Sequence, residues 1–251
     1  MYNTINSDKL KLKGMSLFWI SISLPLMIFV YESLNFFFRV EYIEKMTEMF
    51  NANSLWDYLI FDNSLLLGLG VPLSITIIAS ALCNIEHQSN CWKQILSLPI
   101  PKTNIYLGKL SWLMISLFIS SIALTIGMLL IGFIFNFKGN IPWKSLLGDS
   151  ILVYITSFPI ITLQLWLSMT IKNQAFPIAA GAISSMMGLF FAMNKNLRWL
   201  FWAYPTQAST IMLGEKGLTH NPDLRIFIIG SLVIGCIFLI TGTLHFKHKD
   251  M

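Results

Sequence analysis

The chain contains few charged residues and few cysteines, and each shortage narrows the class of protein. Charged side chains make up 12% of the 251 residues, whereas soluble domains carry roughly 25%. A large soluble core is therefore not expected. The cysteines Cys83, Cys91 and Cys236 are too few and too scattered to predict a disulfide framework.

Two common catalytic motifs are also missing from the sequence. No G-x-x-x-x-G-K-[ST] occurs, so the chain has no P-loop for ATP hydrolysis. No His-Glu-x-x-His or paired Cys-x-x-Cys occurs, and His245 and His248 lie in a polar segment typical of a solvated tail. We therefore expect no catalytic residue and no metal site in this chain.

Apolar side chains, 55% of the total, gather in six runs, and a membrane helix needs about 20 such residues. The first run exceeds the apolar core of a signal peptide and no small-residue cleavage site follows it, so we expect it to be retained. The sequence predicts an all-α membrane protein, a single domain over residues 1–251. Its six transmembrane helices are expected at residues 15–38, 64–85, 103–137, 149–171, 175–193 and 224–246.

The basic residues at the start of the chain predict its orientation. Lys9, Lys11 and Lys13 precede the first span, and Lys and Arg beside the first span favour the cytoplasmic side. Six spans place both termini on the same side. We therefore expect cytoplasmic termini, with the polar segment 86–109 also in the cytoplasm.

Residues 86–109 separate the second span from the third. Trp92, Ile95 and Leu96 are spaced i, i+3, i+4, which predicts a short helix with one apolar face. Pro99 ends that helix, and Thr103 is placed to cap the next one. An amphipathic helix held at the membrane surface by two spans is a docking surface for a soluble partner.

The loop at residues 39–63 is predicted to face outward and is acidic. Apolar residues recur at helical spacing over residues 40–50, which predicts a helix in the outer membrane interface. This helix is interpreted either as a solvated surface or as part of an acidic vestibule for cationic ligands. A carboxylate inside a span is a functional candidate, so the vestibule includes one from the first span; its members are Glu32, Glu41, Glu44 and Glu48.

A second informative loop covers residues 194–223. Its apolar runs, at residues 199–205 and 208–213, are too short to cross the membrane, and they predict re-entrant or interfacial helices between the last two spans. The aromatic residues are interpreted either as a headgroup-level anchor or as an outer gate. The candidates are Trp199, Trp202, Tyr204 and Pro205.

Residues 86–109 resemble the cytoplasmic loop of ABC-2 type permeases. In that family an acidic residue closes the second span, and a run of the form W-K-x-(I/L)-L-x-L-P-(I/V)-x-(K/R) follows. The matching residues are Glu86, Trp92, Lys93, Ile95, Leu96, Leu98, Pro99, Ile100 and Lys102. The amino acids at these positions most resemble those in permeases of lantibiotic-protection (bacteriocin immunity) transporters and of amphipathic-peptide exporters.

The resemblance implies the permease subunit of an ATP-driven exporter in the bacterial plasma membrane. ATP and Mg²⁺ would be bound by a separate ATPase subunit, and this chain would bind no cofactor. A second permease, identical or related, would complete the transporter; lipids and an amphipathic peptide, but no nucleic acid, would be its other partners. The ATPase would contact the coupling loop 86–102 at Glu86, Trp92, Ile95, Leu96, Pro99, Ile100 and Lys102.

Two alternatives remain open from the sequence. One is an ABC-2 exporter of small-molecule drugs or lipids. The other belongs to a different class, a membrane channel or scaffold that is not coupled to ATP.

Overall fold

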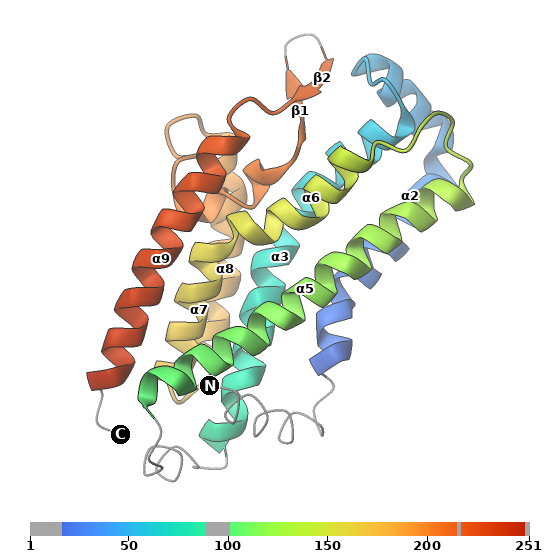
Figure 1. The fold of residues 1–251 in the computed structure, drawn as a ribbon. Coiled ribbons are helices and arrows are strands. Elements are labelled where there is room, and N and C mark those ends of the chain that lie inside the picture. Colours follow the sequence, from blue (N-terminus) through green and yellow to red (C-terminus); the bar gives the residue numbers. More distant parts are fainter. Residues whose placement is uncertain (1–16, 89–100, 215–216, 249–251) are drawn as a thin grey trace.

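Long helices make up most of the computed structural model, which describes residues 17–88, 101–214 and 217–248 (Figure 1). Five of them are long and apolar enough to cross a membrane, or six if the bent pair α6–α7 is counted as one span. The chain is therefore a multi-pass membrane protein. The helices are α2 (Leu17–Met49), α3 (Leu55–Gln88), α5 (Lys102–Ile134), α6 (Trp143–Thr156), α7 (Phe158–Thr170), α8 (Ala175–Met193) and α9 (Leu224–His248).

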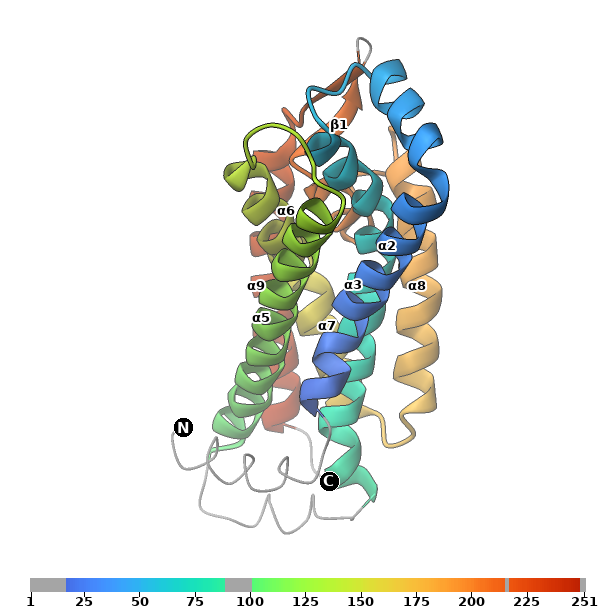
Figure 2. The ribbon, with the colours of Figure 1, turned by 90° about the vertical axis from the view of Figure 1, so that its right-hand side faces the viewer.

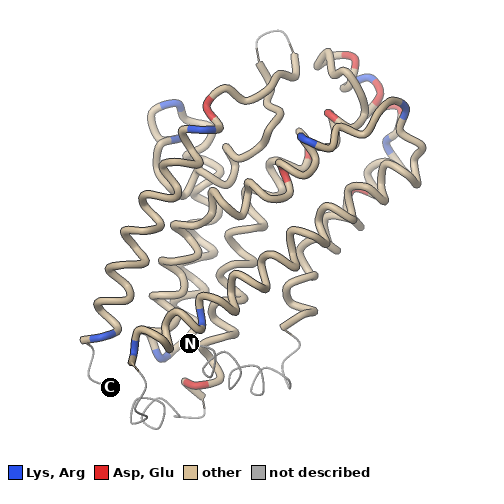
Figure 3. Tube along the Cα trace, in the orientation of Figure 1, with Lys and Arg blue, Asp and Glu red and all other residues tan. Residues whose placement is uncertain are grey.

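The helices run between two ends of the bundle. Helix α2 starts, α3 ends, α5 starts and α9 ends at one of them, which we call the loop end (Figures 1 and 2). The opposite end, which we call the hairpin end, carries the strands β1 (Ile211–Gly214) and β2 (Gly217–His220). Lys, Arg, Asp and Glu are concentrated towards these two ends, as expected for helices whose middle parts lie in lipid (Figure 3).

The first helix differs from the prediction in its length. Residues 40–50, expected as a separate interfacial helix, largely form the outer part of α2, which continues to Met49. The two parts join at a kink, where Arg39 has the non-helical angles φ −128° and ψ 26°. No proline or glycine lies between Arg39 and Met49 to end the helix.

The span expected at residues 149–171 contains a break in the structure. The segment is split into α6 and α7, which are bent by 42°. Pro159 lacks the N–H that would bond the carbonyl of Ile155 in an unbroken helix. The hydroxyl of Ser157 donates to the carbonyl oxygen of Val153 at 2.6 Å, which satisfies part of the last turn of α6.

The loop between α8 and α9 contains elements that the sequence did not predict. Two short 3₁₀ turns, η1 (Phe201–Ala203) and η2 (Thr206–Ala208), replace the expected interfacial helices. They are followed by an antiparallel hairpin in which Ile211 pairs with His220. Gly217, at φ +121°, adopts a conformation that favours glycine at the turn.

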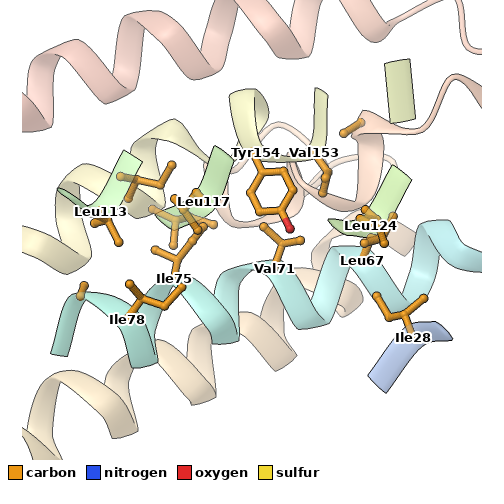
Figure 4. Close-up of a cluster of buried hydrophobic side chains, with 14 of the residues drawn as sticks. Ile28, Leu67, Val71, Ile75, Ile78, Leu113, Leu117, Leu124, Val153 and Tyr154 are labelled. Carbon is orange, nitrogen blue, oxygen red and sulfur yellow. The ribbon is translucent and has the colours of Figure 1, made fainter. Parts of the chain in front are cut away.

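Helix α3 lies at the centre of the bundle and contacts α2, α5, α6, α7 and α8. Its buried face contributes Leu67, Val71, Ile75 and Ile78 to a cluster with side chains of α5 and α6 (Figure 4). The large apolar side chains that remain exposed on α2, α8 and α9 face outward from the bundle. Such a surface is stable in lipid and not in water.

Candidate functional site

A buried ion pair joins the two helices that flank residues 89–100. Nζ of Lys109 on α5 lies 2.5 Å from Oε1 of Glu86 on α3, and it also donates to the carbonyl oxygen of Leu82 at 2.9 Å. The two side chains are 3% and 2% exposed. Separating two such buried charges is costly. The pair therefore fixes the spacing of the last turn of α3 and the second turn of α5.

Further polar contacts tie this end of α3 to the turn between α7 and α8. Nε2 of His87 lies 3.0 Å from the carbonyl oxygen of Ser168. Nε2 of Gln174 donates to the same oxygen at 2.9 Å and to the carbonyl oxygen of Ile171 at 2.7 Å. Higher on α3, the hydroxyl of Ser80 donates to Oε1 of Gln174 at 2.8 Å. These contacts join the end of α3 to α5, to the last turn of α7 and to the residue before α8.

Only two of the predicted ATPase-contacting residues lie in the described part of the chain. Glu86 is enclosed in the ion pair, and its side chain is 2% exposed. Lys102 is the first residue of α5. The others, Trp92, Ile95, Leu96, Pro99 and Ile100, lie outside the described residues.

Towards the hairpin end, one amide group joins two carboxylates. Nδ2 of Asn35 lies 3.4 Å from Oε2 of Glu32 and 3.3 Å from Oδ2 of Asp62. Glu32 is 0% exposed, and its Oε1 has no hydrogen-bond partner among the described residues. Arg39 donates to Oδ1 of Asn35 at 3.4 Å, and its guanidinium group lies 4.3 Å from the centre of the Tyr42 ring.

The structure places the predicted acidic vestibule in two separate locations. Glu32 lies beside Asp62, which the sequence interpretation did not select. Glu44 and Glu48 line a different cavity of about 460 Å³, near the end of α5. Glu41 is exposed and does not line that cavity.

The aromatic segment is packed against the neighbouring helices. The ring of Trp199 lies 5.6 Å from that of Phe227 on α9, and the ring of Tyr204 lies 5.5 Å from the same side chain. Tyr204 is buried, and burial raises the pKa of its phenol. Pro205 is buried as well, and Trp202 stacks on Phe201 at 4.3 Å. These contacts fit an anchor, while a gating role stays a prediction.

The hairpin end is also fixed by a buried carboxylate that sequence reasoning missed. Oδ1 of Asp149 on α6 accepts a hydrogen bond from the backbone N–H of Thr210 at 2.8 Å. Asn221 closes the other side by donating to the carbonyl oxygens of Gln207 and Ser209 at 2.9 and 3.1 Å. The only sequence signal for Asp149 was its place at the edge of a predicted span.

Comparison with protein families gives one match. The family described as ABC-2 family transporter protein matches residues 4–188, well over half of the chain. This region includes both the Glu86–Lys109 pair and the Glu32–Asp62 pair, and it ends within α8. No curated protein and no solved structure matches the chain.

Proposed function

The chain belongs to the ABC-2 family of transporter proteins, and we propose that it is the membrane-spanning subunit of an ATP-driven exporter in a bacterial plasma membrane. Permeases of this family are transport subunits that typically pair with an ATPase subunit. In this proposal ATP and Mg²⁺ are bound by that separate subunit, and two permease chains, identical or related, form the path through the membrane.

The observation that carries the proposal is that the two helices joined by residues 89–100 are held together by a buried ion pair. Residues 89–100 connect α3 to α5, and the buried Glu86–Lys109 pair holds these two helices together just inside the bundle. A force applied to the connecting segment therefore acts on α3 and α5 as one unit. This is the arrangement that a docking loop needs if movement of a soluble subunit is to reach the spans.

Central α3 would then carry the movement to the rest of the bundle. It contacts five other helices, and its end is hydrogen-bonded to Ser168 in the last turns of α7 through His87. ATP binding would favour one of two conformations of the spans, because coupling requires that nucleotide binds the two states with different affinities.

We further propose that the cargo is an amphipathic peptide of the lantibiotic or toxin class. The sequence motif around Trp92 and Pro99 resembles that of peptide exporters, which supports this class. The acidic side chains of α2 would attract a cationic peptide. Small-molecule drugs and lipids are alternative cargoes. A channel without ATP coupling would not need a docking segment between α3 and α5, the two helices that the Glu86–Lys109 pair holds together.

Co-expression with an ATPase subunit encoded beside this gene tests the proposal. The tagged permease should retain the ATPase during purification, and the complex in lipid should hydrolyse ATP faster in the presence of cargo. A permease that purifies alone, with no ATPase retained under mild detergent conditions, would contradict it.

A further inference from the structure

Helices α2 and α3 enclose an apolar groove that the proposed coupling role does not use. Its volume is about 420 Å³, within the range of roughly 300–1,000 Å³ that is typical of small-molecule pockets. The two helices approach closely at Gly70, where a Cβ atom would lie 2.5 Å from Cδ1 of Leu24. The walls include Ile20, Leu24, Met27, Tyr31, Leu66 and Leu73.

The helix faces that line the groove lead directly to the pair of carboxylates. On α3, Asp62 precedes Leu66 and Leu73 by four and eleven residues, so all three lie on one face. On α2, Asn35 follows Tyr31 by four residues and occupies the same face. Asn35 and Asp62 therefore lie one helical turn beyond the lining residues Tyr31 and Leu66, on the side of the groove that is nearer the hairpin, and they hold Glu32 there.

These carboxylates form no direct ion pair in the described part of the chain, although Arg39 lies near Asp62 and bonds the same Asn35. Neither Glu32 nor Asp62 forms an ion pair with a Lys or Arg among the described residues. The Glu32 carboxyl group is directed towards α3, because it shares the amide of Asn35 with Asp62, yet its Oε1 has no hydrogen-bond partner in the described chain. Carboxylates inside a membrane span are expensive unless a cation or a hydrogen-bond donor compensates them.

We propose that the groove and the Glu32–Asp62 pair form one binding site for a cationic amphiphile. The apolar chain of the ligand lies between α2 and α3, and its ammonium or guanidinium group lies at the two carboxylates. A neutral lipid tail would fill the groove equally well but would leave the two carboxylates with only Asn35 and Arg39 near them, so charge complementarity favours the cationic ligand. The inference rests on the proposed function in taking this ligand as the cargo.

Binding to the full chain in phosphatidylcholine nanodiscs tests the site. The probe is tritiated dodecyltrimethylammonium, uncharged dodecyl maltoside is its comparison, and empty nanodiscs give the partition background. We expect saturable binding of the cationic probe, and a loss of roughly tenfold in its affinity when Glu32→Gln and Asp62→Asn are combined. The affinity for the uncharged probe should be unchanged by these substitutions.

Two control variants separate the site from general effects of charge and bulk. Glu41→Gln with Glu48→Gln removes the same charge from α2 outside the groove, and should leave binding of the cationic probe unchanged. Leu66→Trp fills the groove and should abolish binding, whereas Val30→Trp, at a position on α2 that is 48% exposed and outside the groove, should not.

The isosteric acid variants keep the shape of the bundle, so their result stands even if Leu66→Trp fails to fold. Equal binding of the cationic probe to the wild type and to the Glu32→Gln, Asp62→Asn variant would overturn the proposal. The assay contains no ATPase, so its outcome is independent of coupling. A failure of ATPase retention would count against the proposed function alone.

Discussion

The hydroxyl of Ser231 on α9 lies 3.3 Å from the carbonyl oxygen of Ile155, at the junction of α6 and α7, and 2.8 Å from the carbonyl oxygen of Ile228 in its own helix, so its single proton is shared between these two acceptors. In an unbroken helix that carbonyl would accept a bond from residue 159, which here is Pro159. The bend is therefore stabilised from a different helix, and α9, which lies beyond the matched family region, takes part in it.

Ser231→Ala should destabilise the bundle by about 1 kcal/mol, because a buried carbonyl loses a donor. Chemical unfolding in detergent micelles, followed by tryptophan fluorescence, measures this change. Ser184→Ala is the matched control, since Ser184 is half-buried and its hydroxyl bonds only to carbonyls of its own helix. Equal effects of the two substitutions would contradict the role of Ser231 at the bend.

Lys109→Met should destabilise the protein by about 3–5 kcal/mol, because it leaves the Glu86 carboxylate buried without its cation. Replacing both partners, with Lys109→Met and Glu86→Leu, should restore much of the loss, since no charge is then left uncompensated. Lys172→Met removes an exposed cation at the same end and should change stability little. The free energy of unfolding of the four proteins in micelles checks this, and a double variant as unstable as the single one would refute it.

Trp92→Ala should leave membrane insertion intact and weaken retention of the ATPase. Truncation of a buried aromatic anchor at an interface costs about 2 kcal/mol or more, roughly thirtyfold in affinity. Trp19→Ala is the control, because Trp19 is 69% exposed on the outer face of α2. Unchanged recovery of the ATPase, together with unchanged cargo-stimulated hydrolysis, would remove Trp92 from the docking surface.

Cysteine labelling in whole cells determines the orientation. In a background without Cys83, Cys91 and Cys236, a cysteine at Asn53 or His220 should react with an impermeant thiol reagent in intact cells, because both positions are exposed at the hairpin end. A cysteine at Lys172, exposed at the loop end, should react only after lysis. The reverse pattern would place the coupling loop beyond the reach of a cytoplasmic ATPase.

Hydropathy was sufficient to locate the helices, because the lipid-facing surface must be apolar along each span. The predicted run 175–193 coincides with α8 (Ala175–Met193). Breaks within helices were harder to predict from the sequence. Pro159 lies within a run that is mostly apolar, and the carbonyl of Ile155 that it leaves without an N–H donor lies near the hydroxyl of Ser231 on α9, a contact that no local pattern predicts.

The polar contacts inside the bundle were largely invisible to sequence patterns. Glu32 and Asp62 lie on different helices, as do Glu86 and Lys109, and no local spacing relates either pair. Glu32 was selected because a carboxylate within a span is unusual, but its neighbour Asp62 had been assigned to an outer loop. The hairpin was missed because its strands are only four residues long.

Helix α3 carries Asp62 towards one end and Glu86 at the other, about 36 Å apart along an α-helix that rises 1.5 Å per residue. In the proposed mechanism it would act as a lever, with one arm at the segment that joins α3 to α5 and the other at the groove. A tilt about its middle, where Pro72 removes one backbone hydrogen bond, moves the two arms in opposite directions. If an ATPase drives such a tilt, a ligand that holds Asp62 against α2 would oppose or favour it, and by thermodynamic reciprocity the ligand and the nucleotide would change each other's affinity by the same factor.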